Sequence, residues 1–290
     1  TTLGKGSWEQ AESALQKIAV QLALKKGTLA ARQIDLIFAG DLLNQCIGST
    51  FGLRDFGIPL IGLYGACSIM ALYLLNAALA VDGGAAERAV AVTSSHFCSA
   101  ERQFRQPLDY GGQRPPTAQW TVTGAGACVL GRGEGIAVEA VTPGRVVDLG
   151  IKDANNMGAA MAPAAADTIR RFFSDTGTSP ADYDRVYTGD LGAVGSRLLC
   201  ELLDKEGVDL RPVHRDCGVM IYDAVRQDVH AGGSGCGCSA SVLCAHVLPE
   251  MAAGRHKNVL FCATGALMSP TSSQQGESIP GIAHLVRLRA

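Results

Sequence analysis

Aromatic residues and net charge are both scarce in this chain. Only 6% of the 290 residues are Phe, Trp or Tyr, and the formal net charge is −2. A balance this close to neutrality gives no electrostatic basis for binding nucleic acid or an anionic membrane surface. No apolar run approaches the roughly 18 residues that span a bilayer, so we expect any membrane association to come through a partner.

Metal-ligand and phosphate-binding motifs are missing as well. Cys236-Gly237-Cys238 has one intervening residue and no second C-x-x-C pair, so zinc is not indicated. Phosphate loops, dinucleotide fingerprints and a dedicated calcium loop are also absent. The ten cysteines are scattered and no signal peptide precedes them, which favours a reducing, cytoplasmic location. The sequence predicts neither a resident metal nor a cofactor.

What the chain does have is 35 glycines and an alternation of helix-like and strand-like segments. A helical period runs from Trp8 to Lys26 and ends at Gly27. We expect its buried stripe to comprise Ala11, Leu15, Ile18 and Leu22. Strand-like runs at 34–39, 59–64 and 89–93, with a helix at 67–81, predict an α/β protein whose mostly parallel sheet is covered on both faces.

The two halves of the sequence repeat each other. Asp35–Leu42 is echoed by Asp184–Leu191, 149 residues later, and Val90 before one strand matches Val259 before another, 169 residues later. A repeat this long indicates a duplicated domain. We divide the chain into an N-terminal half, 1–143, and a C-terminal half, 144–290.

Strand partners follow from this division. Gly124–Leu130 and Ile136–Val141 are expected to pair as antiparallel edge strands of the first half. Val146–Leu149 is expected to be the first strand of the second half. Its counterpart would fall before Thr1, so the first strand of the first half is predicted to be missing upstream.

Cys67 is the leading candidate for chemistry. It follows a strand-like run in Tyr64-Gly65-Ala66-Cys67-Ser68, at the predicted start of a helix. A helix N-terminus carries partial positive charge, which favours a thiolate. The 169-residue offset places Cys236 at the equivalent position, so the two half-sites should face each other across a pseudo-twofold axis. The alternative is a buried structural cysteine.

His230 is the leading candidate for a general acid or base. It precedes a glycine-dense loop that contains Ser234, just before the helix that should pair with the Cys67 helix. His214, at the end of a short strand, is the weaker candidate. The alternative for either residue is a satisfied structural histidine, and we assign that role to His246, His256 and His284.

Three arginines occur in the long polar segment 94–120: Arg102, Arg105 and Arg114. Arginine binds carboxylates through two parallel hydrogen bonds, so any of the three is a candidate partner for an anionic ligand. The alternative is a solvated connection between strands.

The duplication, the helix-start Cys67 and the His-Gly-Gly loop together resemble the thiolase and ketoacyl synthase superfamily. Over nearly the whole chain, the sequence more closely resembles the stage V sporulation protein AD family. The resemblance is carried by residues 39–45, 63–68, 93–120, 150–158, 227–239 and 275–284. It implies a thiolase-like duplicated α-β-α-β-α layered fold, with two pseudo-equivalent halves and mixed five-stranded sheets.

The resemblance also implies a function. A protein of this family is expected to bind dipicolinic acid (pyridine-2,6-dicarboxylate), alone or as its calcium complex, and to support its uptake into the developing spore. Membrane proteins of the same operon would be partners at the forespore or spore inner membrane, and a homodimer is expected by analogy. The ligand-binding set would be Cys67, His230, Ser234, Arg102, Arg105 and Arg114.

Two other functions stay open from the sequence. An acyltransferase would use Cys67 as the nucleophile with His230 or His214 as the acid or base. Thiolases carry a second Cys on the last glycine-rich turn, but the turn here, 275–280, has none. This departure argues against thiolase chemistry proper. The third function is a scaffold with a vestigial pocket that docks on a membrane complex.

Overall fold

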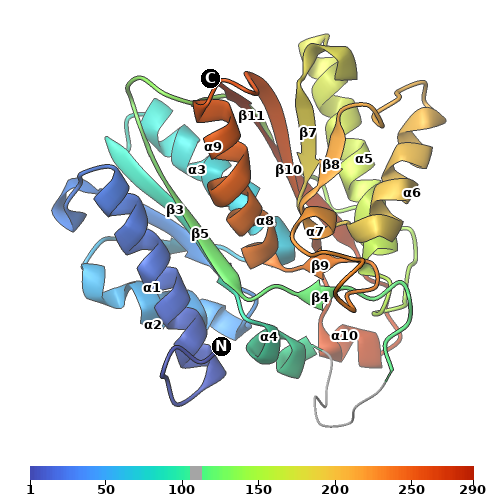
Figure 1. Ribbon diagram of the computed structural model, residues 1–290, viewed down its shortest axis with the longest axis horizontal. Helices are drawn as coiled ribbons and strands as arrows, with labels where there is room; N and C mark the ends of the chain where they lie inside the picture. Colours follow the sequence, from blue (N-terminus) through green and yellow to red (C-terminus); the bar gives the residue numbers. More distant parts are fainter. Residues whose placement is uncertain (105–112) are drawn as a thin grey trace.

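Helices and sheets alternate in five layers in the computed structural model, which describes residues 1–104 and 113–290 (Figure 1). An outer pair of helices covers the first sheet, central helices separate the two sheets, and a second outer pair covers the second sheet. One apolar core lies between the sheets, and smaller cores lie under each outer pair. The expected α-β-α-β-α layering is confirmed.

The first sheet has the strand order β2-β1-β3-β5. Its first three strands are parallel, and β5 runs antiparallel to β3. The strands are β1 (Leu36–Gly40), β2 (Leu60–Gly62), β3 (Arg88–Ser95) and β5 (Gly124–Gly131). Helices α1 (Trp8–Lys26) and α2 (Ile47–Leu53) cover its outer face.

The second sheet has the order β6-β11-β10-β7-β8. Its strands are β6 (Ala137–Thr142), β7 (Arg185–Thr188), β8 (His214–Asp216), β10 (Asn258–Ala266) and β11 (Gly281–Arg289). Strand β6 pairs with β11, so the expected pairing of Gly124–Leu130 with Ile136–Val141 is wrong. Alternating hydrophobicity marks a strand but does not identify its partner. If each half is defined by the strands of its own sheet, the boundary between the halves falls in the loop before Ala137. The predicted boundary, after residue 143, lies slightly later.

The internal repeat is visible in the hydrogen bonds. Asp35 accepts the backbone N–H groups of Glu87 and Arg88, and Asp184 accepts those of Lys257 and Asn258. Strands β2, β1, β3 and β5 correspond in order to β8, β7, β10 and β11. Within the described residues, only the second sheet has a fifth strand.

That fifth strand is β6, not the segment predicted to begin the second half. In the expected strand Val146–Leu149, only Val147 forms a bridge, to Gly281. Both Val146 and Leu149 are exposed. With one bridge and two exposed apolar side chains, the segment contributes little to either sheet.

Helix α1 has its predicted bounds but a different buried face. Ser7 caps its N-terminus and Gly27 its C-terminus. Ile18 and Leu22 are exposed, whereas Glu12 and Gln16 are fully buried. The hydroxyls of Ser94 and Ser99 donate to the Glu12 carboxyl group, and Gln16 donates to the Gly40 carbonyl. Polar partners supplied by the sheet therefore decide which face of the helix is buried.

The central layer contains the two helices that the repeat predicted to face each other. These are α3 (Ile69–Asp82), preceded by a 3-10 turn at Ala66–Ser68, and α8 (Cys236–Val242), continued by the π-turn η7 (Leu243–Val247) and α9 (Leu248–Ala252). The residues before Cys67 and Cys236, Ala66 and Gly235, both have positive φ, at 51° and 102°. The equivalence of Cys67 and Cys236 is therefore present in the backbone.

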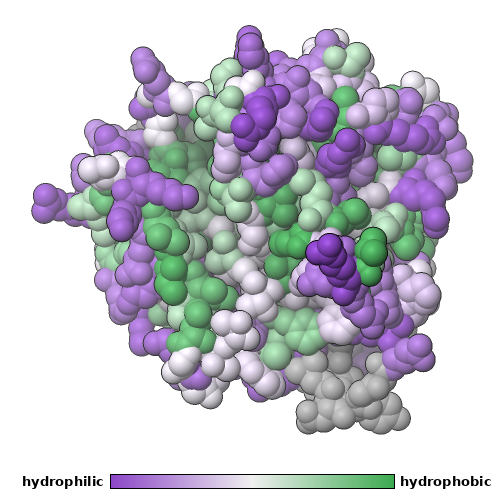
Figure 2. Space-filling model, viewed as in Figure 1, coloured by the Kyte–Doolittle hydropathy of each residue, from purple (hydrophilic) through white to green (hydrophobic). Residues whose placement is uncertain are grey.

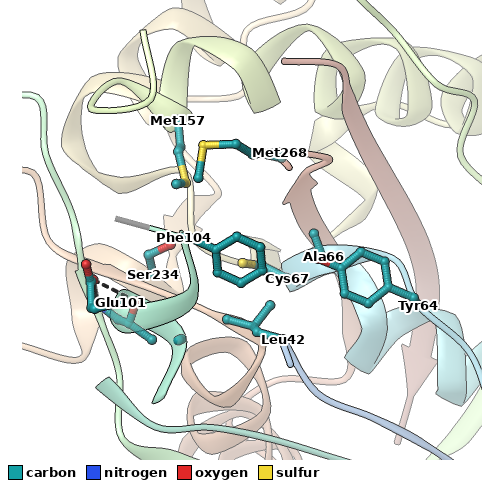
Figure 3. Close-up of a pocket in the computed structure, with 12 residues that line it drawn as sticks. Leu42, Tyr64, Ala66, Cys67, Glu101, Phe104, Met157, Ser234 and Met268 are labelled. Carbon is teal, nitrogen blue, oxygen red and sulfur yellow. Dashed lines mark hydrogen bonds between the residues drawn. The ribbon is translucent and has the colours of Figure 1, made fainter. Parts of the chain in front are cut away.

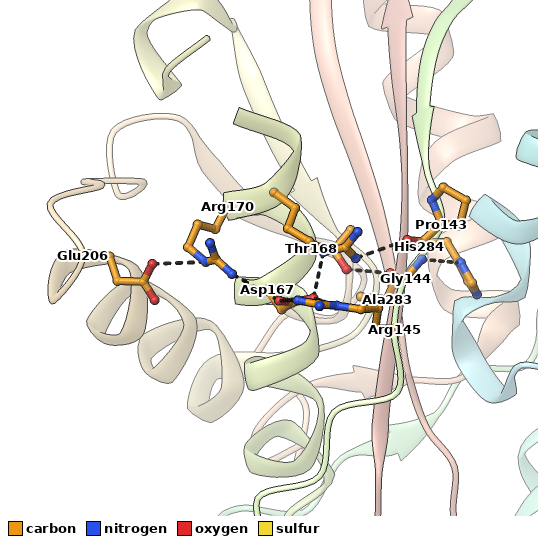
Figure 4. A network of polar contacts seen from close by, with 10 residues as sticks. Pro143, Gly144, Arg145, Asp167, Thr168, Arg170, Glu206, Ala283 and His284 are labelled. Carbon is orange, nitrogen blue, oxygen red and sulfur yellow. Dashed lines mark hydrogen bonds and ion pairs between the residues drawn. The ribbon is translucent and has the colours of Figure 1, made fainter. Parts of the chain in front are cut away.

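The outer helices of the second half are α5 (Met157–Thr176) and α6 (Gly192–Asp204). A polar network fixes the connection from β6 to α5 (Figure 4). Arg145 pairs with Asp167 at 2.5 Å, and the N–H of Gly144 donates to Nδ1 of His284 at 3.0 Å. A Cβ at Gly144 would lie 1.9 Å from the Ala283 carbonyl oxygen, so only glycine fits there.

The remaining elements are short. They are α4 (Phe97–Phe104), β4 (Trp120–Thr121), α7 (Cys217–Met220), β9 (Gly233–Ser234) and α10 (Pro270–Gln274). Strands β4 and β9 pair in parallel and connect the two halves. Across the described parts of the chain, every helix is too short or too polar to cross a membrane.

Candidate functional site

A pocket of about 420 Å³, counted with the open space at its mouth, lies where the two halves meet (Figure 3). Its walls are mostly apolar and come from both halves. The lining residues are Leu42, Tyr64, Ala66, Cys67, Ala100, Glu101, Phe104, Thr121, Met157, Ser234, Ala266 and Met268. Two of the predicted site residues, Cys67 and Ser234, are thus brought to one pocket.

Close backbone packing holds Cys67 in place. The turn that carries it packs directly on β10, because Gly265 offers no side chain there. A Cβ at Gly265 would lie 2.6 Å from the Gly65 carbonyl oxygen and 3.2 Å from the Cys67 nitrogen. The Cys67 side chain is largely buried but still lines the pocket.

A buried carboxylate, Asp190, lies beside Cys67. It follows β7 and accepts hydrogen bonds from the Ser234 hydroxyl at 3.0 Å, the Gly235 N–H at 2.8 Å and the Thr264 hydroxyl at 2.9 Å. Its charge also acts on the nearby Cys67 thiol. Burial raises the pKa of Asp190, and these donors act in the opposite direction.

This environment keeps the Cys67 thiol protonated. Burial raises its pKa well above the usual value, and the neighbouring Asp190 charge raises it further. Only the Gly235 N–H acts to lower it. The expected helix-start thiolate is therefore not favoured, because desolvation and a carboxylate outweigh the partial charge of a helix terminus.

His230 is not among the residues that line this pocket. Its Nδ1 lies 2.9 Å from the Pro115 carbonyl oxygen, and its Nε2 lies 2.9 Å from the Asp228 carboxylate. Both ring nitrogens thus have partners in the loops around it. The geometry gives His230 a role in joining these loops and does not bring it to Cys67 as the sequence suggested.

His214 is also outside the lining. Its Nε2 lies 2.8 Å from the Thr188 hydroxyl, which itself donates to Asp216. Burial lowers the pKa of His214 to about 4, with a smaller contribution from Arg215. A neutral imidazole hydrogen-bonded between β8 and β7 supports the sheet, away from the residues that line this pocket.

The three candidate arginines have different surroundings. Arg102 pairs with Glu9 on α1 and stacks over the Trp8 ring. Arg114 pairs with Glu101 at 3.0 Å and lies over the Trp120 ring. Arg105 falls outside the described residues, so its predicted contact with a ligand stays a prediction.

Sequence reasoning missed Asp190 and Glu101. The carboxylate of Glu101 is buried at the pocket wall, where it accepts the Thr121 hydroxyl at 2.9 Å and the Arg114 guanidinium. A signal for Asp190 was present: Gly189-Asp190 repeats Gly40-Asp41 at the end of equivalent strands. Ligands bind outside the carboxyl ends of strands in such sheets, which singles out residues at those ends.

No group of three or more His, Cys, Asp or Glu side chains suited to a metal occurs in residues 1–104 and 113–290.

Comparison with known proteins identifies the family. The sequence profile of the family described as stage V sporulation protein AD matches residues 1–289. The stage V sporulation protein AD of Bacillus subtilis (strain 168) is 49% identical over 279 residues, which cover 96% of this chain and 82% of that protein. The chain belongs to the stage V sporulation protein AD family. A role in sporulation follows from this membership.

Solved structures place this family member in the thiolase fold. A tetronic acid condensing enzyme, AbyA1, matches with a TM-score of 0.62 and 18% identity, covering 96% of this chain and 86% of its own. The 3-oxoacyl-[acyl-carrier-protein] synthase III of Aquifex aeolicus VF5 matches with a TM-score of 0.62 and 14% identity, covering 96% and 84%. The Acat5 thiolase of Ascaris suum reaches 0.63 with 13% identity, covering 98% and 95%. At these identities the likeness concerns the fold alone.

Proposed function

We propose that this protein binds dipicolinic acid, alone or as its calcium complex, in the pocket beside Cys67, and that it supports uptake of the acid into the developing spore. One observation carries the proposal: the pocket of a condensing-enzyme fold is kept, but its cysteine is buried near Asp190, and burial and that charge hold the thiol pKa well above its usual value. A protonated thiol is a poor nucleophile and a weak hydrogen-bond donor. Such a site suits binding better than catalysis.

The lining suits a small flat ring with polar ends. Tyr64, Phe104 and Met268 offer aromatic and thioether surfaces, and Figure 3 shows them around the cavity. The Ser234 hydroxyl and the Cys67 thiol lie together on one wall. This combination of apolar walls with a few convergent polar atoms is typical of small-molecule sites.

Charge favours the calcium complex over the free dianion. Among the described lining residues the charged side chain is Glu101, which Arg114 neutralises, and Asp190 lies buried behind Cys67. Within residues 1–104 and 113–290, this arrangement offers no excess positive charge to a dicarboxylate. A one-to-one calcium chelate is neutral and avoids that penalty.

The test is calorimetric titration of dipicolinic acid into the intact chain, with calcium and with a calcium chelator. We expect binding in both arms, tighter with calcium. Cys67→Ala and Ser234→Ala should each weaken binding at least about tenfold, since each removes a group from the pocket wall. Cys98→Ala, a half-buried cysteine outside the lining, is the matched control. A well-folded chain that binds in neither arm would refute the proposal.

His230→Ala and Arg105→Ala test the remaining predicted contacts. Because both His230 ring nitrogens are engaged elsewhere, its replacement should leave the dissociation constant nearly unchanged. Arg105 is proposed to pair with a ligand carboxylate, so its replacement should weaken binding about tenfold. Equal effects of the two variants would contradict this division of roles.

The acyltransferase alternative makes a different prediction. An enzyme using Cys67 would gain the mass of an acyl group when incubated with an acyl thioester. We expect no such adduct on the intact chain, because the thiol is protonated beside Asp190. Rapid stoichiometric acylation of Cys67 would favour the enzyme.

Partners and location complete the proposal. We propose a homodimer that associates peripherally with the inner membrane of the forespore or spore, through membrane proteins of its operon. The scaffold alternative is separated by measuring dipicolinic acid uptake into spores that carry the Cys67→Ala/Ser234→Ala double variant, beside a pull-down of those membrane proteins. A carrier keeps these contacts but loses the ligand and the uptake, whereas a scaffold loses neither contacts nor uptake.

A further inference from the structure

Two cysteines far apart in the sequence meet outside the pocket that Cys67 lines. Cys128 lies on β5 and Cys244 in the π-turn η7, and their sulfur atoms are 3.7 Å apart. Both thiols are free and partly exposed. A disulfide needs about 2.05 Å between sulfurs, so a shift of less than 2 Å would join them.

Backbone packing brings the two residues together. A Cβ at Gly126 would lie 2.4 Å from the Ala240 carbonyl oxygen, so α8 and β5 are in direct backbone contact just before the cysteines. The helix then widens into the π-turn ahead of Pro249, whose ring does not fit a regular α-turn. Cys244 lies in this widened turn, and its sulfur also contacts the Ala127 carbonyl at 3.7 Å.

Cys128 is reachable from solvent through a groove. The groove encloses about 1370 Å³, including its open mouth, between β5, α3, the 131–136 loop and the start of α9. Figure 2 shows this face of the molecule hollowed, with hydrophobic residues in the recess. A small disulfide reagent can therefore approach the pair without unfolding of the chain.

We propose that Cys128 and Cys244 are a redox-active pair that closes to a reversible disulfide between the two halves. One thiolate attacks a low-molecular-mass disulfide such as oxidised glutathione and releases one molecule of the reduced thiol. The second thiolate then displaces the other, so the two cysteines lose two electrons and two protons. Cys128 lines the groove and meets the reagent there, and the contact between the two thiols lowers the pKa of Cys244.

The disulfide would be a covalent cross-link between the two halves. It would tie the edge strand of the first sheet to the central helix of the second half, across 116 residues of sequence. Constraining so long a loop in the unfolded chain raises thermal stability, by roughly 5–10 °C for a protein of this size. The cross-link would lie at one wall of the groove, so forming the disulfide would also fix the position of η7.

The experiment equilibrates the full chain in buffers of reduced and oxidised glutathione, quenches it with iodoacetamide, and maps the peptides by mass spectrometry. We expect one linked pair, Cys128 with Cys244, a loss of two hydrogen masses and a higher melting temperature. Cys128→Ser and Cys244→Ser should each abolish both the link and the stabilisation. Cys98→Ser, which removes another half-buried thiol, should abolish neither.

The peptide map of the natural chain tests for the Cys128–Cys244 disulfide directly, so the proposal stays testable even if a variant folds poorly. A link between any other cysteines, stable glutathione adducts on Cys128 or Cys244 without closure, or ten alkylated cysteines in fully oxidised buffer would overturn the proposal.

Discussion

At the scale of single residues, the chemistry of the site is decided by what lies beside Cys67. A thiol at a helix start gains some acidity from the backbone, but a buried carboxylate acts on it from a shorter distance in a medium of low polarity. Asp190 is held by three protein donors, so its position is fixed. In these surroundings the Cys67 thiol is held in its neutral form.

Asp190→Asn should release the Cys67 thiol. Removing the charge lowers the pKa of Cys67, and each unit of decrease gives about ten times more thiolate at a pH below that pKa. We expect alkylation of Cys67 by iodoacetamide at pH 8 to be about tenfold faster or more, followed by peptide mass spectrometry.

Asp41→Asn is the matched control for this variant. Asp41 occupies the equivalent place in the first half, but its carboxylate accepts the Ser49 hydroxyl and N–H, not the Cys67 thiol. Alkylation should stay unchanged in this variant. An equal rate increase in both variants, or in neither, would contradict the role given to Asp190.

The sequence predicted part of the site correctly, and the reason differs from residue to residue. Cys67 and Ser234 were identified because a helix start after a glycine-rich turn has a recognisable local pattern. His230 was preferred to Asp190 because a histidine in such a loop suggests catalysis, whereas contacts with Pro115 and Asp228 depend on tertiary structure. The identity of a side chain predicts its chemistry, but only the fold decides its neighbours.

At the scale of elements, α1 shows why boundaries are easier to predict than burial. Ser7 and Gly27 end the helix by local chemistry, and the prediction there is confirmed. The buried face was predicted wrongly, since the Glu12 carboxyl group and the Gln16 amide nitrogen have hydrogen-bond partners on β1, β3 and α4 that no helical period reveals. The same limit applies to β6, whose partner β11 lies more than 130 residues later.

The buried carboxyl group of Glu12 should make stability depend on pH. Burial raises its pKa from 4.5 to about 8, with a further contribution from Asp41. The folded state then keeps a proton that the unfolded state releases above about pH 4.5. This stabilisation is complete below pH 4.5 and is lost as pH rises toward 8, by on the order of 4 kcal/mol.

Glu12→Gln removes this titration and keeps an uncharged group of the same shape. Urea unfolding between pH 5 and 8 should show a clearly smaller loss of stability in the variant than in the natural chain. Glu9→Gln, on the same helix but paired at the surface with Arg102, should leave the slope unchanged. Parallel pH profiles for all three proteins would argue against the protonated state of Glu12.

At the scale of the whole molecule, the two halves share one core. The central cluster joins side chains of α3 and β3 to those of α8 and β10, so neither half can bury its inner face alone. We expect a single calorimetric transition whose calorimetric and van't Hoff enthalpies agree. Separately expressed halves, 1–136 and 137–290, should each remain unfolded or aggregate. Two resolved transitions would show that the halves are independent domains.

Strand β11 lies between β10 and β6, and this order has a consequence for synthesis on the ribosome. Strand β6 emerges early but can join its sheet only after Gly281–Arg289 has left the exit tunnel, because β11 separates it from every other strand. Through much of the second half of translation the chain therefore carries an unpaired β6 beside an incomplete second sheet. Such exposed edges are aggregation-prone, so the nascent protein should depend on a chaperone until its last strand is released.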